Sequence, residues 1–206
     1  MAAMSRAVRG AHLRYYQPQT CGRAQIERFV TECYARQYGA RLADFFPHQL
    51  ALFDEAGLRG CLGFRPADAG GLFLEQYLDA PVDTLLGGRL GMVAHRSDVV
   101  EVGGLAADWS GAARRLILMA IGWLGAAGYR IAAFTATRSL VNSFRRLQLQ
   151  PLDLGLAEPS RLARSDTDWG RYYDHGPHVY AGLIGIGPAT RVPAAAEPVS
   201  SQPQPC

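Results

Sequence analysis

The segment from Val99 to Thr135 constrains the fold more than any other part of the chain. Its pattern predicts a strand over residues 99–105, a strongly apolar helix over 110–127 that stops at Gly128, and a second strand over 131–135. A strand, a helix and a strand in this order form a parallel βαβ unit with a right-handed crossover. We therefore expect these two strands to be parallel neighbours in one sheet.

The flanking segments add antiparallel strands and further helices. Apolar residues at helical spacing predict a helix over 22–38, and two apolar runs at 49–54 and 58–64 predict a hairpin. The other expected elements are an extended piece over 72–77, a helix beginning near Pro81, a helix over 138–147 capped by Thr137, and strands over 151–154 and 178–186. A hairpin followed by a βαβ unit predicts a single α/β domain with a mixed central sheet and helices on both faces.

The two ends of the chain differ from its middle. Residues 1–11 are rich in Arg, Ala and Gly and are expected to be loose, whereas 187–206 hold five of the twelve prolines and read as a disordered Pro/Ala-rich tail. The folded domain is therefore expected to span 12–186. The N-terminus lacks the apolar run of a signal peptide, and the longest apolar stretch, 116–127, is too short to cross a bilayer. We expect a cytoplasmic protein without stable membrane insertion.

Composition excludes several kinds of site. All 21 basic residues are Arg, so the Schiff-base lysine and the P-loop lysine are excluded. The net charge of +3 and the lack of interleaved aromatic and basic residues argue against a nucleic-acid partner. The acidic and His-containing run 166–175 fits no EF-hand or zinc spacing, so no metal site is expected. Instead, this run predicts a loop that packs Trp169, Tyr172 and Tyr173 over a cleft.

Residues 108–113 join the first strand of the βαβ unit to its helix. Their small side chains leave the backbone N–H groups of the helix N-terminus accessible, which is a natural seat for a phosphate or pyrophosphate. The same residues also fit an ordinary turn between a strand and a helix. Both interpretations remain open at the level of sequence.

Glu101 is the candidate catalytic residue. It alternates to the face opposite Val100 and Val102, and an acid on a central strand is costly unless it lies in a cleft or is paired. Partial burial would raise its pKa and suit it to accept a proton from an amine. The alternative is a structural ion pair with Arg130 or Arg138.

The order of the elements resembles the GNAT acyltransferase fold. The phosphate-binding loop of that family, Gln/Arg-x-x-Gly-x-Gly/Ala, is matched at Gly111 and Ala113, while Asp108 replaces the Gln or Arg. A carboxylate at this position disfavours a nucleotide diphosphate. Phe144 stands where the family usually places a tyrosine that acts as a general acid, so the resemblance implies that this acid is absent.

A narrower resemblance is to the thermostable hemolysin family, whose fold is GNAT-like and similar to that of acyl-homoserine-lactone (autoinducer) synthases. It covers most of 12–186, and Gly104 stands where the family's strand motif Glu-Val-Gly-Asn-Leu-Ala has Asn. The matching segments are 73–81, 101–106, 134–137, 142–147 and 168–173.

The resemblance implies an N-acyltransferase. An acyl group would pass from an acyl-phosphopantetheine thioester, on acyl carrier protein or CoA, to the amine of a small acceptor, in a cleft between the splayed strands 99–106 and 130–136. No tightly bound cofactor is implied. The catalytic residue would be Glu101. Donor-binding residues would be Leu105, Ala106, Ser110, Gly111, Ala112, Ala113, Arg114, Arg115 and Asn142, and acceptor-binding residues would be Glu75, Tyr77, Thr135 and Trp169.

Partners and other functions remain open. The pairs Arg114-Arg115 and Arg145-Arg146 could meet the acidic face of acyl carrier protein or form a solvated helix face. A membrane-damaging hemolysin and a catalytically inactive GNAT-like binding module are the two alternatives to an enzyme. The oligomeric state is not determined by these patterns.

Overall fold

The computed structural model describes residues 10–90, 93–163 and 166–185. The expectations for residues 1–9 and for the tail 187–206 lie outside this range. The α-helices are α1 (Arg23–Tyr38), α2 (Val82–Leu90), α3 (Ser110–Ala126) and α4 (Arg138–Arg146). The strands are β1 (His12–Tyr16), β2 (His48–Asp54), β3 (Gly57–Pro66), β4 (Val99–Ala107), β5 (Ile131–Ala136), β6 (Leu152–Leu156) and β7 (His178–Leu183).

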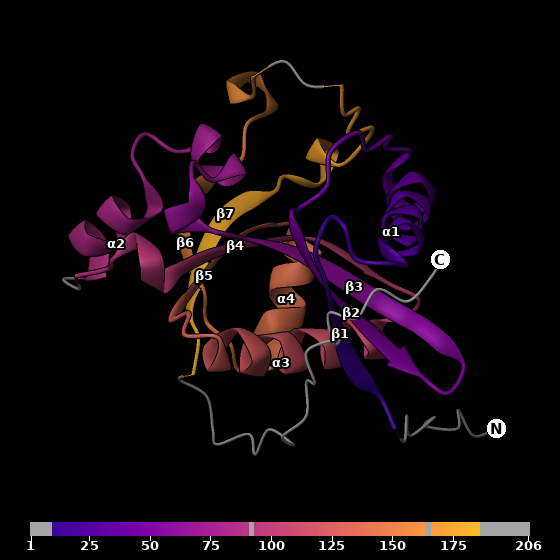
Figure 1. Ribbon diagram of the computed structural model, residues 1–206. Coiled ribbons are helices and arrows are strands. Elements are labelled where there is room, and N and C mark those ends of the chain that lie inside the picture. Colours follow the sequence, from indigo (N-terminus) through magenta and orange to yellow (C-terminus); the bar gives the residue numbers. More distant parts are fainter. Residues whose placement is uncertain (1–9, 91–92, 164–165, 186–206) are drawn as a thin grey trace.

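The described strands form one seven-stranded sheet in the order β1-β2-β3-β4-β5-β7-β6 (Figure 1). β4 and β5 run parallel, with Val99 opposite Ile131 and Val102 opposite Phe134, and the other neighbouring pairs are antiparallel. This confirms the predicted βαβ unit, the hairpin and the mixed sheet.

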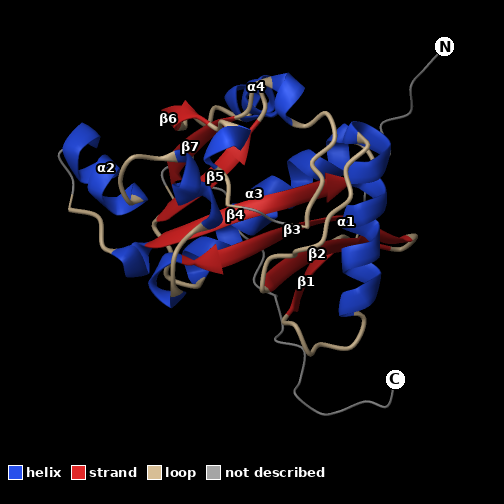
Figure 2. Cartoon of the chain, turned by 90° about the horizontal axis from the view of Figure 1, so that it is seen from above, coloured by secondary structure: helices blue, strands red, loops and turns tan. Residues whose placement is uncertain are grey.

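Helices cover both faces of the sheet. Successive residues of a strand point to opposite faces, so the strands offer apolar side chains to helices on each side. On one face, Leu116 and Leu124 of α3 pack in a cluster with Leu50 and Val100, and α4 lies beside α3. On the other face, Ile26 of α1 packs in a cluster with Ala51 and Ala106, and α2 lies over the β5–β7 end (Figure 2). The prediction of helices on both faces is confirmed.

The prediction of an extended piece over 72–77 is wrong. Phe73–Tyr77 form a 3-10 helix, η2, whose N-terminal turn is closed by the Glu75 carboxylate accepting a hydrogen bond from the Leu72 N–H at 3.0 Å. Leu74 and Tyr77 are buried. Thr137 does precede α4, as expected, but its side chain makes no capping hydrogen bond. β1 escaped prediction because His12–Tyr16 bury only Leu13 and Tyr16, which is too short an apolar pattern to stand out.

β4 and β5 separate beyond Val102 and Phe134. β4 runs on to Ala107 along β3 alone, with an irregularity in the β3–β4 register at Cys61–Gly63 and with Gly104 in the left-handed region at φ 59°. Glycine adopts this conformation without steric cost. The edge of β4 beyond Val102 is therefore free to face a gap in the sheet, as predicted for splayed strands.

Candidate functional site

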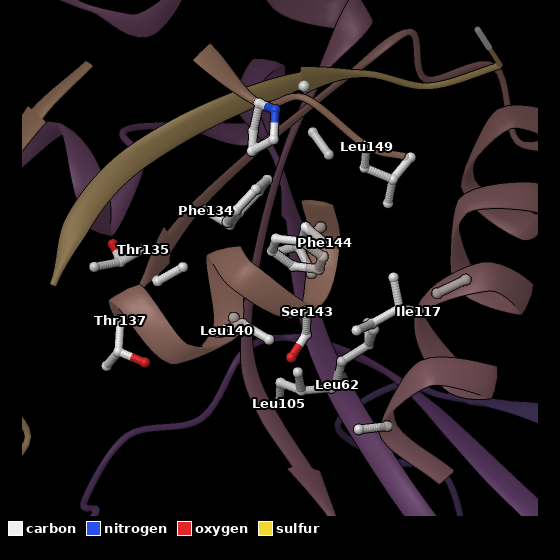
Figure 3. A pocket seen from close by; sticks show the side chains of 18 of the residues that line it. Leu62, Leu105, Ile117, Phe134, Thr135, Thr137, Leu140, Ser143, Phe144 and Leu149 are labelled. Atoms are coloured by element: carbon white, nitrogen blue, oxygen red, sulfur yellow. The ribbon is translucent and has the colours of Figure 1, made fainter. Parts of the chain in front are cut away.

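A cavity of about 740 Å³ lies where β4 and β5 separate. Its walls come from β4 at Val102–Leu105, from β5, from α3 and α4, and from α1 on the opposite face of the sheet. Figure 3 shows apolar side chains around it together with the hydroxyls of Thr135, Thr137 and Ser143. None of the described residues that line the cavity is charged. The cavity therefore suits an apolar group with a few polar atoms.

The part of the cavity beside α3 is a long apolar channel. It is lined from Ser110 to Leu124, and the 14 residue steps between them span about 21 Å at a rise of ~1.5 Å per residue. Ile117 and Ile121 line its middle, and Ile184 lies at the Leu124 end. A channel of this length and composition fits an extended hydrocarbon chain.

Three tyrosines line the other end of the cavity. Tyr34 and Tyr38 of α1 lie 5.6 Å apart between ring centroids, and Tyr38 meets Tyr172 edge to face at 5.2 Å. Burial raises the pKa of each of the three hydroxyls, so they stay protonated and can donate hydrogen bonds. Gln37 adds an amide. Sequence reasoning missed these residues: Tyr34 is part of the apolar spacing that predicted the helix over 22–38, and no sequence pattern marks Gln37 or Tyr38 as cavity residues.

The predicted wall loop is anchored to the end of α1. Arg41 and Asp168 exchange two backbone hydrogen bonds of 2.6 and 2.9 Å, and Gly170 lies against the carbonyl oxygen of Tyr38 with no room for a side chain. The structure places Tyr172 in the cavity wall. Trp169 packs behind it, against Tyr172 at 5.6 Å and Phe73 at 6.0 Å between ring centroids.

Glu101 is only 2% exposed and lies outside the set of residues that line the cavity. Its Oε2 accepts a hydrogen bond from the Phe73 N–H at 2.8 Å, and its Oε1 accepts one from the Leu74 N–H at 3.0 Å. The alternative prediction, an ion pair with Arg130 or Arg138, is absent from the described contacts. Arg65, opposite on β3, is the nearby cation. Burial raises the pKa of Glu101 to about 7, although the two N–H donors and Arg65 act against the shift.

This raised pKa predicts a pH-dependent stability. The carboxyl has a pKa of about 7 in the folded chain against 4.5 ordinarily, so between these values the unfolded chain loses its proton while the folded chain keeps it. The contribution of Glu101 to the free energy of unfolding should therefore be highest below pH 4.5, fall between pH 4.5 and 7, and level off above 7. Urea denaturation from pH 4 to 8 would show this fall in wild type relative to Glu101→Gln, which does not titrate. A constant difference between the two proteins would contradict the prediction.

Of the other candidate acceptor-binding residues, only some line the cavity. The Glu75 carboxylate accepts hydrogen bonds from the Leu72 and Val82 N–H groups and pairs with Arg96 at 2.6 Å. Tyr77 is buried, and its hydroxyl lies 2.5 Å from that of Tyr173. Both residues lie outside the cavity lining, whereas Thr135 is part of it.

The candidate donor residues are also divided. Leu105, Ser110 and Ala113 line the cavity, while Ala106 and Ala112 are buried in the packing of the two sheet faces. The remaining four lie outside the lining: Gly111, Arg114, Arg115 and Asn142. Among these, Gly111, Arg114 and Asn142 are exposed.

Asp108 is paired with a cation on the neighbouring strand. Arg59 of β3 donates to its Oδ2 at 3.2 Å and to Asp54 Oδ1 at 2.8 Å. This pairing offsets the negative charge that Asp108 would otherwise present at the start of α3. The charge repulsion expected from the sequence is therefore weaker than an unpaired carboxylate would give.

In the described part of the chain, no helix has both the length and the apolar composition that a membrane span requires. The described His, Cys, Asp and Glu side chains include no group of three or more placed to hold a metal ion.

Comparison with known proteins agrees with this architecture. No curated protein sequence matches the chain. FeeM, an N-acyl amino acid synthase from uncultured soil microbes, is 16% identical, with a TM-score of 0.57 over 84% of this chain and 90% of its own. The AHL synthase LasI is 9% identical, with a TM-score of 0.56 over 84% and 89%. BjaI, a CoA-dependent acyl-homoserine lactone synthase solved with SAM and isopentyl-CoA, is 10% identical, with a TM-score of 0.56 over 85% and 84%.

The likeness to these structures confirms the predicted GNAT-like fold. The model of the thermostable hemolysin family matches residues 16–187, which include β2 to β7 and only the last residue of β1. The chain belongs to the thermostable hemolysin family.

Proposed function

We propose that this protein is an N-acyltransferase that moves an acyl group from a phosphopantetheine thioester to the amine of a small acceptor. The observation that carries the proposal is that one cavity, lined by the described residues, extends through the β4–β5 gap. It joins an apolar channel on the α3 face to a tyrosine-lined end beside α1. A thioester bound in the channel and an amine bound among the tyrosines would meet at the gap.

The reaction follows from this placement. The amine nitrogen attacks the thioester carbonyl carbon, a C–N bond forms, the C–S bond breaks, and the thiol leaves after gaining a proton. The free edge of β4 around Gly104 and Leu105 would offer backbone N–H groups to the oxyanion. Holding both reactants at the gap supplies a large part of the rate by proximity.

Glu101 is the proposed proton acceptor, acting through water because its carboxyl lies outside the cavity lining. Its pKa of about 7 suits a group that must take up a proton near neutral pH. The tyrosine hydroxyls would orient the acceptor. Phe144, in the cavity wall, cannot supply the proton for the leaving thiol.

The relatives in structure support the same chemistry. FeeM is an N-acyl amino acid synthase and LasI an acyl-homoserine lactone synthase, and the products named in both cases carry an acyl group. The exposed Arg114, Arg145 and Arg146 lie on α3 and α4, the two helices that line the channel. They are the proposed docking residues for an acidic acyl carrier protein. We propose that the reaction takes place in the cytoplasm and involves no nucleic-acid partner.

Mass spectrometry of the purified full chain, incubated with acyl carrier protein or CoA thioesters and a panel of small amines, tests the proposal. The expected result is release of free thiol together with an N-acyl amine. Native mass spectra should also show a co-purified acyl thioester or product. If no thioester is bound or consumed at any chain length, the proposal fails.

The channel predicts a preference for long acyl chains. Each further methylene buried beside α3 should add ~0.8 kcal/mol, or about fourfold in kcat/KM, until the channel is full. Ile121→Trp should narrow the channel at its middle and shift the preference to shorter chains. Leu118→Trp is the matched control, since Leu118 lies on the same helix but is 38% exposed and outside the lining. Equal kcat/KM for short and long chains would contradict the prediction.

A further inference from the structure

Trp109 lines the cavity and occupies the N-cap position of α3. Its indole lies against Gly111 so closely that a Cβ at that position would be 2.6 Å from Nε1 and 3.0 Å from Cδ1. Side chains of a helix lean toward its N-terminus. The indole therefore fills the space beside Gly111 in the first turn of α3, where the first backbone N–H groups have no partner within the helix.

The indole is held in this place from its outer side. The guanidinium of Arg59 lies over the ring, 5.5 Å from its centroid, which is cation–π distance. Arg59 is itself fixed by Asp54 at 2.8 Å and Asp108 at 3.2 Å. Trp109 nevertheless remains 40% exposed while it lines the cavity, so its indole is accessible from solvent.

This arrangement bears on how a donor can enter. A nucleotide diphosphate binds at a helix N-terminus through the free N–H groups of the first turn. In this chain the diphosphate of CoA would have to displace the indole and break its contact with Arg59. A carrier-protein thioester carries no adenine nucleotide, and its pantetheine arm ends in a single phosphate. Such a donor can reach the channel without using the first turn of α3.

We propose that Trp109 selects the acyl donor, by filling the place of the CoA diphosphate so that a carrier-protein thioester is used in preference to acyl-CoA. This inference rests on the proposed acyltransferase function, and it assigns the choice between the two donors to one side chain. Trp109 is a specificity-determining residue in this role.

The first test measures binding alone. Isothermal titration of the full chain with 3′-phospho-ADP, the nucleotide half of CoA, should show weak binding to wild type and about tenfold tighter binding to Trp109→Ala. Trp109→Phe keeps a ring over Gly111 and should behave as wild type. Tight binding to wild type overturns the proposal. A loss of binding in Trp109→Ala also overturns it, because the indole would then be a stacking platform for adenine.

The second test measures turnover. Two thioesters with the same acyl group are compared, acyl-CoA and acyl-pantetheine. The ratio of kcat/KM for acyl-CoA to kcat/KM for acyl-pantetheine should be below one in wild type and rise about tenfold in Trp109→Ala. Leu118→Ala, an exposed residue of the same helix, should leave the ratio unchanged. An unchanged ratio in a folded Trp109→Ala overturns the proposal. If neither thioester is turned over, the proposed function fails, while the nucleotide titration still decides the role of Trp109.

Discussion

Glu101→Ala is expected to lower the free energy of unfolding by about 3 kcal/mol. The substitution leaves the Phe73 and Leu74 N–H groups without their acceptor at a site where Glu101 is 2% exposed. A buried donor that loses its partner costs ~1–3 kcal/mol, and the loss of the carboxyl's own desolvation offsets part of the sum. In a chain of this size, the melting temperature should fall by about 10 °C.

Thermal denaturation followed by circular dichroism measures this effect. Glu32→Ala is the matched control, because Glu32 is exposed on α1 and its loss should change stability by less than ~0.5 kcal/mol. Glu101→Gln should lie between wild type and Glu101→Ala, since an amide oxygen can satisfy only one of the two N–H groups. A melting temperature of Glu101→Ala equal to that of wild type would show that η2 does not depend on this carboxylate.

The same variant separates the two roles of Glu101. The rate of acyl transfer is measured well below the unfolding temperature of Glu101→Ala, so that the variant is folded. If Glu101 relays the acceptor's proton, this rate should be about two to four orders of magnitude lower than in wild type. If Glu101 only anchors η2, the folded protein should retain turnover, with a loss no larger than the fraction unfolded. The sequence suggested that Glu101 lies in a cleft or in a structural ion pair. The structure instead makes destabilisation the expected result, because both carboxylate oxygens are bound to backbone.

The elements that were predicted correctly are those with local signals. The apolar period of α1 and α3 and the hairpin of β2 and β3 are visible within windows of a few residues. The segment around η2 was predicted wrongly because part of what holds it is not local. Its N–H groups bond Glu101, 27 and 28 residues away, and no pattern within Leu72–Tyr77 encodes that partner.

The candidate site shows the same division. Leu105, Ser110 and Thr135 were predicted from the resemblance to the family and do line the cavity. Tyr34 and Tyr38 could not be separated from the core stripe of α1, since both kinds of residue share helical spacing. Their role depends on Tyr172 reaching α1 from the loop near the end of the chain, a contact that only the tertiary structure supplies.

Gly104→Val is expected to reduce acyl transfer by about a hundredfold, the cost of losing one oxyanion donor. Gly104 has φ 59°, a conformation that a β-branched residue avoids at a cost of ~1–2 kcal/mol. Space is not the constraint, because a Cβ would lie 3.8 Å from Phe46 and 3.9 Å from Gly63 N. The strain should therefore be relieved by turning the peptide groups that face the β4–β5 gap.

Gly104→Asn is the informative companion, because Asn tolerates the left-handed region. The family motif has Asn at this position, so the asparagine variant should fold with near wild-type stability and keep most of its activity. The control for backbone strain is Gly57→Val, at φ 107° in the β2–β3 turn and away from the cavity. It should lower the melting temperature without lowering kcat. If Gly104→Val and Gly104→Asn have the same kcat, the conformation at Gly104 does not shape the reaction site, and the oxyanion must be bound elsewhere.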